Sequence, residues 1–247
     1  MDESAITTKV VLEASGISKT FPGVKALDDV SISLNEGEVL SLVGENGAGK
    51  STLTKILSGL YRTDHDGGSI KLNGELVRFQ NSKEAKDHGL ITIFQELSLV
   101  KGLTVAENIF LGNLPRTKLG LIDWSELRAK AEKILGEVEL DVSPDELVGD
   151  LSISRQQMVE IARALTLGAK VIIFDEPTSS LTETEKDVLF KNINTLRKKG
   201  VGIIYITHKM DEVFEISDRI TVLRDGKNSG NLITSEAKLD DIISLMI

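Results

Sequence analysis

Apolar and polar positions alternate in the first part of the chain. Val, Ile and Leu alternate with polar side chains through residues 10–34, which predicts two or three strands with loops at Gly16 and Pro22. Shorter alternating segments at residues 69–72 and 76–79 are joined by an Asn-Gly pair, which is typical of a hairpin turn. These segments predict an antiparallel flank of strands.

Continuous apolar runs occur elsewhere and alternate with segments of helical period. The runs predict buried strands at residues 39–43, 90–94, 171–174, 202–206 and 220–223. The intervening segments predict helices at residues 50–58, 82–88, 183–199, 210–216 and 235–246. Such alternation favours an α/β fold with a mainly parallel sheet covered by helices on both faces.

The middle of the chain has a different pattern, because residues 97–165 contain no convincing strand. Asp123 to Glu126 resembles a capping box that opens a helix to about Val138. A second apolar stripe of helical period predicts a helix at residues 154–167. We therefore expect a single domain over residues 1–247, in which residues 97–165 form a helical sub-domain inserted between core segments 1–96 and 166–247.

Composition narrows the class of protein. The chain has 247 residues, 40% of them hydrophobic, which is enough for a sizeable core. It lacks cysteine, which excludes disulfides and thiolate metal sites, and no apolar run reaches the roughly 18 residues of a membrane span. With 38 acidic and 29 basic residues the net charge is −9, which argues against a large nucleic-acid footprint. We expect a chain that neither spans a membrane nor is secreted, with protein or small-molecule partners.

A glycine-rich segment follows the apolar run at residues 39–43 and reads G-E-N-G-A-G-K-S-T. A strand, a glycine-rich turn and a helix, in that order, are typical of a loop that binds nucleotide phosphates through backbone N–H groups. Lys50 can reach the terminal phosphates and Ser51 can hold Mg²⁺. A glycine turn with a surface lysine would leave the two adjacent hydroxyls unexplained. The predicted phosphate-binding residues are Gly44, Glu45, Asn46, Gly47, Ala48, Gly49, Lys50, Ser51 and Thr52.

Two carboxylates, Asp175 and Glu176, end the apolar run at residues 171–174. Parallel-sheet proteins bind ligands at the carboxyl ends of their strands. Asp175 is predicted to hold Mg²⁺ together with Ser51, and Glu176 to orient and polarise the attacking water. The alternative is a solvated pair that caps a helix, which is the weaker interpretation beside a phosphate loop.

Several motifs follow one another along the chain: the phosphate loop, Gln95, L-S-I-S-R-Q-Q at 151–157, I-I-F-D-E-P-T at 172–178 and His208. Their order and spacing resemble those of ABC-transporter ATPase domains, and the resemblance covers essentially the whole chain. The segments 21–27, 94–97, 104–112 and 157–165 resemble, more narrowly, the first cassette of bacterial monosaccharide importers of the ribose, galactose and xylose type. Those proteins fuse two cassettes, so the chain resembles an amino-terminal half or a shorter relative.

The resemblance implies roles for three further residues. Gln95 would reach Mg²⁺ and the attacking water, although a glutamine at a strand end can equally bond to backbone. His208 would contact the γ-phosphate, whereas a lone histidine is more often a satisfied structural residue. Phe21 would stack on adenine, or it is plain packing.

The signature segment departs from the form L-S-G-G-Q that is commonest in the family. Leu151 and Ser152 match, but Ile153 and Ser154 replace both glycines and Arg155 replaces the glutamine. In the family, Leu151, Ser152 and Ser154 would cover the γ-phosphate bound by the opposite cassette. A Cβ at Ser154 narrows that approach. Thr182 stands where an aspartate is usual, which affects one contact between cassettes.

The sequence therefore predicts an ATPase that binds ATP and Mg²⁺ and powers monosaccharide import. The resemblance implies a second cassette as partner, in a head-to-tail pair or as a fused half. It also implies a transmembrane sugar permease, which would hold this chain at the cytoplasmic face of the membrane, and, indirectly, a sugar-binding protein. The alternatives are a cassette with weak or regulatory ATPase activity and a non-transport ABC protein acting on nucleic acid or ribosomes. A P-loop kinase or GTPase has no support, because no N-K-x-D motif is present.

Overall fold

The computed structural model describes residues 9–64, 66–94, 97–179 and 181–247. They form two compact units. The first contains the described residues up to Thr92, with Lys170–Glu176 and Leu196–Ile247, and the second contains the described residues of Ile93–Ala169 and Pro177–Thr195. The sub-domain boundaries expected from the sequence, 97–165, stay a prediction.

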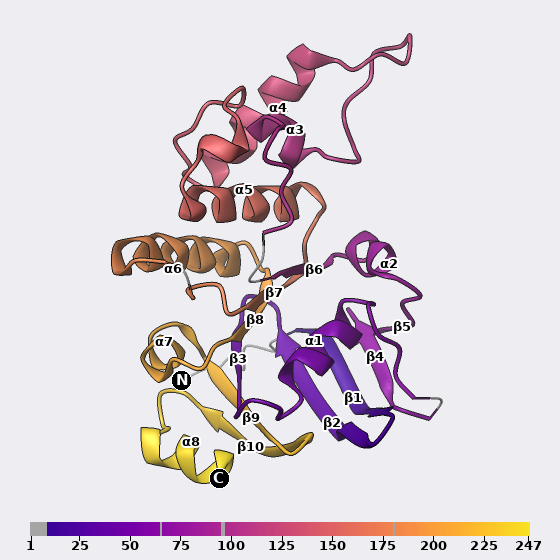
Figure 1. The fold of residues 1–247 in the computed structure, drawn as a ribbon, viewed down its shortest axis with the longest axis vertical. Helices are drawn as coiled ribbons and strands as arrows, with labels where there is room; N and C mark the ends of the chain where they lie inside the picture. The colour runs from indigo at the N-terminus through magenta and orange to yellow at the C-terminus, as the bar shows by residue number, and fades with distance from the viewer. Residues whose placement is uncertain (1–8, 65, 95–96, 180) are drawn as a thin grey trace, which may run out of the picture. The chain divides into compact units, whose positions relative to one another are not determined.

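A six-stranded sheet forms the centre of the first unit (Figure 1). Strand β3 pairs in parallel with β8 on one side and β9 on the other, β7 pairs in parallel with β8, and β10 pairs antiparallel with β9. The carboxyl ends of β3, β8 and β7 therefore meet at one edge, and the α/β class is confirmed. In sheet order the strands are β10 (Lys227–Ile233), β9 (Arg219–Arg224), β3 (Val39–Val43), β8 (Gly202–Ile206), β7 (Val171–Asp175) and β6 (Leu90–Ile93).

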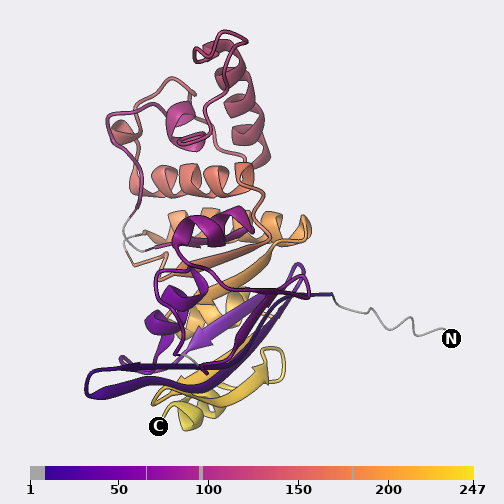
Figure 2. The same ribbon diagram turned by 90° about the vertical axis from the view of Figure 1, so that its right-hand side faces the viewer.

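A second sheet has the predicted antiparallel flank, in the order β2-β1-β4-β5. Strands β1 and β2 form one long hairpin (Figure 2), so no loop interrupts β1 at Gly16. Gly16 instead lies at a register shift, with φ of +68°, because glycine accommodates a bulge where the alternating pattern breaks. The strands are β1 (Val10–Phe21), β2 (Val24–Asn35), β4 (Ser69–Leu72) and β5 (Glu75–Val77), the last ending two residues earlier than predicted.

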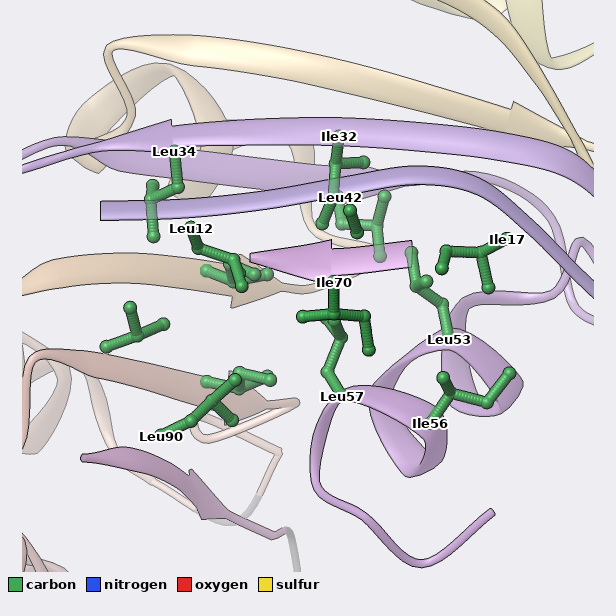
Figure 3. Packing of buried hydrophobic residues seen from close by; sticks show 14 of the residues in the cluster. Leu12, Ile17, Ile32, Leu34, Leu42, Leu53, Ile56, Leu57, Ile70 and Leu90 are labelled. Atoms are coloured by element: carbon green, nitrogen blue, oxygen red, sulfur yellow. The ribbon is translucent and has the colours of Figure 1, made fainter. Parts of the chain in front are cut away.

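Helix α1 (Lys50–Leu57) packs its apolar face into the main core of the first unit (Figure 3). Leu53 and Leu57 are fully buried against side chains such as Ile70 of β4. Burying a Leu side chain contributes about 1.5–3 kcal/mol. This packing fixes the first turn of α1 beside the end of β3.

Three more helices complete the first unit, and one strand was missed by the sequence analysis. Helix α8 begins at Leu239 rather than Ser235, because the Asp241 carboxylate accepts the N–H of Lys238 at 2.9 Å and sets the first turn there. Strand β10 was not predicted, because its sequence K-N-S-G-N-L-I is polar and contains glycine. The helices are α2 (Ser82–Asp87), α7 (Met210–Ile216) and α8 (Leu239–Met246).

Helices form the second unit. Helix α4 (Trp124–Glu137) begins as predicted, with the Asp123 carboxylate accepting from the N–H of Glu126 at 2.9 Å. Helix α3 (Val105–Ile109) was missed, because five residues are too few for a helical period to show. The others are α5 (Ile153–Thr166), the 3-10 turn Val148–Asp150 and α6 (Glu183–Lys198), whose last turn belongs to the first unit. Across the part of the chain that is described, no helix has the length and apolar character needed to cross a membrane.

Candidate functional site

The glycine-rich loop between β3 and α1 follows a path that only glycine permits at two points. Gly44 has a φ of +154°, and a Cβ there would lie 2.3 Å from the carbonyl oxygen of Leu223. Gly49 has a φ of +103°, and its Cβ would lie 2.8 Å from the carbonyl oxygen of Ala26. The neighbouring backbone therefore fixes the loop tightly against the sheet.

Helix α1 begins immediately after this loop. Its N-cap is Gly49, which offers no side chain to the first-turn N–H groups. Ser51 is exposed and Thr52 is half-buried in that turn. The first turn of a helix carries unsatisfied N–H groups and the positive end of the helix dipole, which together favour an anion such as phosphate.

The Lys50 side chain folds back over the loop. Its Nζ donates hydrogen bonds to the carbonyl oxygens of Gly44 at 2.7 Å and of Glu45 at 3.0 Å. Burial lowers the pKa of the Lys50 ammonium, and the negative charges of Glu176 and Asp175 oppose that shift. A buried cation is thus held close to two carboxylates.

Asp175 and Glu176 lie at the carboxyl end of β7. Burial raises the pKa of the Asp175 carboxyl, and the charge of Glu176 raises it further, while Lys50 and Lys55 act in the opposite direction. Glu176 adopts a φ of +49°, with its N–H donating to the carbonyl oxygen of Ile206 at 2.9 Å. A left-handed conformation at a residue other than glycine costs free energy and is often found at ligand sites.

His208 follows β8 and meets one of these carboxylates. Its Nδ1 atom lies 3.4 Å from Oε1 of Glu176, with the imidazole 64% exposed and the carboxylate 31% exposed. The first unit therefore brings together four residues predicted from the sequence: Lys50, Asp175, Glu176 and His208.

Sequence reasoning missed one buried group beside this site. Glu212 has no exposed surface and accepts hydrogen bonds from the hydroxyls of Tyr205 and Thr207, which both lie just before His208 in the chain. The available signal was that Glu212 lies in the first turn of the helix that follows His208. This signal is weak, because the first turns of helices commonly carry acidic residues.

Phe21 is half-buried at the end of β1. Its ring packs edge-on against Tyr61 with centroids 5.5 Å apart, and the Lys19 Nζ lies 5.5 Å from its centroid. Stacking of Phe21 on adenine stays a prediction. Gln95 lies outside the described residues.

The signature segment belongs to the second unit, at the start of α5. Leu151 is buried, Ser154 is half-buried, and Ser152 is the exposed N-cap, whose hydroxyl accepts from the N–H of Arg155 at 3.4 Å. Gln157 is buried and its Nε2 donates to the carbonyl oxygen of Pro177 at 2.6 Å. The signature segment is therefore anchored within the second unit through α5, whose Gln157 bonds to the backbone at Pro177.

Among curated proteins of similar sequence are several that are named as sugar-import ATP-binding proteins. The chain is 51% identical over 237 residues to the ribose import ATP-binding protein of Streptomyces avermitilis, covering 96% of this chain and 45% of that protein. It is 49% identical over 240 residues to the xylose import ATP-binding protein of Thermoanaerobacter pseudethanolicus, covering 97% and 47%. The chain thus spans about half the length of the curated relatives it matches.

Solved structures and a family profile also match this chain to ATP-binding cassettes of ABC transporters. A nucleotide-free ATP-binding cassette from an ABC transporter superposes with a TM-score of 0.83 at 28% identity, covering 96% of this chain and 99% of that one. The ADP conformation of MJ1267, an ATP-binding cassette of an ABC transporter, gives a TM-score of 0.81 at 29% identity, covering 96% of this chain and 99% of that one. The ABC transporter profile matches residues 27–179. The phosphate loop, the paired carboxylates and these matches establish that the chain belongs to the ABC transporter family.

Proposed function

We propose that this chain binds ATP with Mg²⁺ and hydrolyses it to power import of a monosaccharide through a membrane permease. The main support for the proposal is that Lys50, Asp175, Glu176 and His208 lie close together at one edge of the sheet. The sugar class rests on the names of the ribose and xylose import relatives.

The residues present fit a magnesium ion held jointly with nucleotide phosphates. Mg²⁺ prefers oxygen ligands and is usually held by one or two protein groups, with phosphates and waters completing its shell. Ser51 presents an exposed hydroxyl and Asp175 a carboxylate, and within the described ranges no three His, Asp or Glu residues gather into a self-sufficient metal site. Ser51 and Asp175 would hold the ion, with Gln95 joining them, and the bound ion would neutralise developing charge on the phosphates.

The remaining residues supply positioning and proton transfer. Lys50 exchanges its two carbonyl contacts for the terminal phosphates, while backbone N–H groups of residues 44–52 hold the phosphate chain. Glu176 accepts the proton of the attacking water, and His208 beside it contacts the γ-phosphate. Phe21 stacks on adenine.

The signature segment lies on the second unit, away in sequence from every phosphate-loop residue. We propose that Leu151, Ser152 and Ser154 complete the site of a second cassette, either a head-to-tail partner or a fused half. The chain would then lie at the cytoplasmic face of the membrane, bound to a transmembrane permease that is served by a sugar-binding protein, and closure of the cassette pair would drive a conformational change in the permease.

Two substitutions test the proposal. Lys50→Ala should abolish ATP binding or turnover, because it removes the only buried cation of the described loop. Glu176→Gln should keep ATP binding and slow hydrolysis by about 10²–10⁴-fold, the usual contribution of a general base. Binding is measured with a fluorescent ATP analogue and hydrolysis by phosphate release.

Glu139→Gln is the matched control, because Glu139 is also a glutamate with positive φ (+53°) but belongs to the second unit. Its turnover should equal that of the unmodified chain. Unchanged turnover in Glu176→Gln would reject the role of Glu176, and normal activity in Lys50→Ala would reject the phosphate site altogether.

A weak or regulatory ATPase is the second candidate, favoured by the departures at Ser154 and Arg155. The Ser152 hydroxyl already accepts the N–H of Arg155 in the first turn of α5, so one fewer N–H donor is available there to bind a phosphate. A single-turnover assay with a partner cassette added separates the two candidates, because a regulatory cassette would hold ATP without releasing phosphate.

A further inference from the structure

Glu212 is a fully buried carboxylate with no part in the proposed chemistry. It lies in the first turn of α7, four residues after His208, and none of its surface is exposed. Burying a carboxylate is costly unless several donors satisfy it, so its surroundings call for an explanation.

The donors to Glu212 come from both sides of His208. Oε2 accepts from the Tyr205 hydroxyl at 2.8 Å and from the Thr207 hydroxyl at 3.1 Å. Oε1 lies 3.2 Å from the ammonium of Lys209. The Thr207 hydroxyl also accepts the N–H of Lys209 at 3.1 Å, so the residues on either side of His208 are tied to one another as well as to Glu212.

His208 itself lies at the surface, with its Nδ1 atom 3.4 Å from Glu176. An exposed imidazole is directed mainly by the backbone that carries it, and here that backbone is the one tied to Glu212. Replacing a buried ionic group with apolar residues often leaves the stability of a protein unchanged or raises it, so stability alone is a weak explanation for Glu212. A fully satisfied polar network, in contrast, restricts the geometry of the residues that form it.

We infer that Glu212 is a positioning residue, which holds the turn at residues 207–209 so that His208 meets Glu176 and the γ-phosphate. The inference rests on the proposed function of His208. It makes Glu212 part of the support of the active site.

Glu212→Gln preserves size but weakens the network, because one acceptor oxygen becomes a donor. Turnover should fall by about 10- to 100-fold, the scale of a misplaced reacting group, while affinity for a non-hydrolysable ATP analogue stays unchanged. Thr207→Val removes a single hydroxyl from the network and should give a smaller fall in turnover. It also tests the inference if Glu212→Gln fails to fold.

The decisive measurement is a double-mutant cycle with His208→Ala. If Glu212 acts through His208, Glu212→Gln should cause no further loss of turnover once the imidazole is gone. The Cε1–H resonance of His208, one of only three histidines, should also move in Glu212→Gln. A merely stabilising role would leave the resonance in place and the loss of turnover undiminished in the His208→Ala background.

Glu38→Gln is the matched control. Glu38 is a buried carboxylate of the same unit, 7% exposed and paired with Arg219, but it precedes β3 at the opposite edge of the sheet. The Glu38→Gln substitution should lower the unfolding temperature without changing turnover or the His208 resonance.

The measured turnovers distinguish a failure of the positioning role of Glu212 from a failure of the proposed ATPase function. If His208→Ala slows turnover but folded Glu212→Gln and Thr207→Val hydrolyse ATP normally, the inference alone is wrong. If the unmodified chain with a partner cassette hydrolyses no ATP, or His208→Ala retains full turnover, the proposed function or the role of His208 fails and the inference falls with it.

Discussion

Helices α1 and α5 both begin at a segment that we propose contacts nucleotide, but their first turns are built differently. Helix α1 starts at Gly49, which has no side chain to offer its N–H groups. Helix α5 starts at Ser152, whose hydroxyl accepts the N–H of Arg155 at 3.4 Å. The start of α1 is thus left open for an anion, whereas the start of α5 partly satisfies itself.

The same contrast extends to buried polar groups. In the first unit, burial shifts the pKa values of Lys50 and Asp175, and Glu176 has a left-handed backbone. In the second unit, the Asn108 amide nitrogen donates to three backbone carbonyls and Glu160 accepts from the N–H and hydroxyl of Ser98. Lys50, Asp175 and Glu176 are thus held in unfavourable states beside the proposed ligand site, while Asn108 and Glu160 of the second unit bond within their own unit.

The largest expected effect comes from adding a side chain to the open helix start. Gly49→Ala should lower the free energy of unfolding by about 2–4 kcal/mol, through the strain of a positive φ and the clash with Ala26. ATP binding should be lost as well, because the loop must shift. Urea denaturation followed by circular dichroism measures the first effect, and titration with a fluorescent ATP analogue measures the second.

Gly47→Ala is the control, because Gly47 also has a positive φ, of +88°, but no heavy atom lies within 4 Å of its added Cβ. It should lose only the conformational part, about 1 kcal/mol. Equal losses in the two variants would show that the close backbone approach at Gly49 contributes nothing.

A smaller effect is expected at the self-satisfied helix start. Ser152→Ala should cost about 0.5–1 kcal/mol, because the cap is removed, and Ser152→Gly only a few tenths. Trp124 is the only tryptophan of the chain and lies in the second unit, so its fluorescence during urea denaturation reports on that unit. Asp123→Ala should cost more, since its cap bond is shorter at 2.9 Å. An unchanged midpoint in Ser152→Ala would mean that α5 is as open at its start as α1.

The sequence predicted the elements on which chemistry depends better than those that surround them. The order of apolar strand, glycines and lysine located the phosphate loop, because each residue there has a steric or electrostatic role that few others fill. Strand β10 and helix α3 were missed, because one is polar and the other has only five residues. Strand β10 is stabilised by its pairing with β9, which a local pattern does not encode. Helix α3 does begin with a local signal, the capping box of Thr104 and Glu107, but the helix is too short for an apolar period to support it.

The candidate site shows the same limit. Glu176 and His208 were found from strand ends and family motifs, but nothing local indicated that their side chains lie 3.4 Å apart. That contact depends on the parallel pairing of β7 with β8, a long-range feature. Glu212 was missed for a related reason, since its burial follows from three donors that are recognisable only in the folded turn.

The smallest expected effect concerns the shifted carboxyl at the ligand site. Because the folded state raises the pKa of Asp175 above its ordinary value of 3.8, it holds that proton more tightly than the unfolded chain does. The ionised carboxylate therefore destabilises the fold at neutral pH, and the penalty disappears as the pH falls through the raised pKa.

Asp175→Asn should accordingly raise the free energy of unfolding at pH 7 by about 0.5 kcal/mol, although it removes a proposed Mg²⁺ ligand. The gain should shrink toward zero as the pH falls to about 4, in thermal denaturation at a series of pH values. Asp225→Asn makes the same substitution at an aspartate whose side chain is 91% exposed, and it serves as the control for the change from Asp to Asn itself. A gain that stays constant from pH 4 to pH 8 would show that Asp175 carries no desolvation penalty, and the contrast between the two units would then rest on Lys50, Glu176 and the glycines of the phosphate loop.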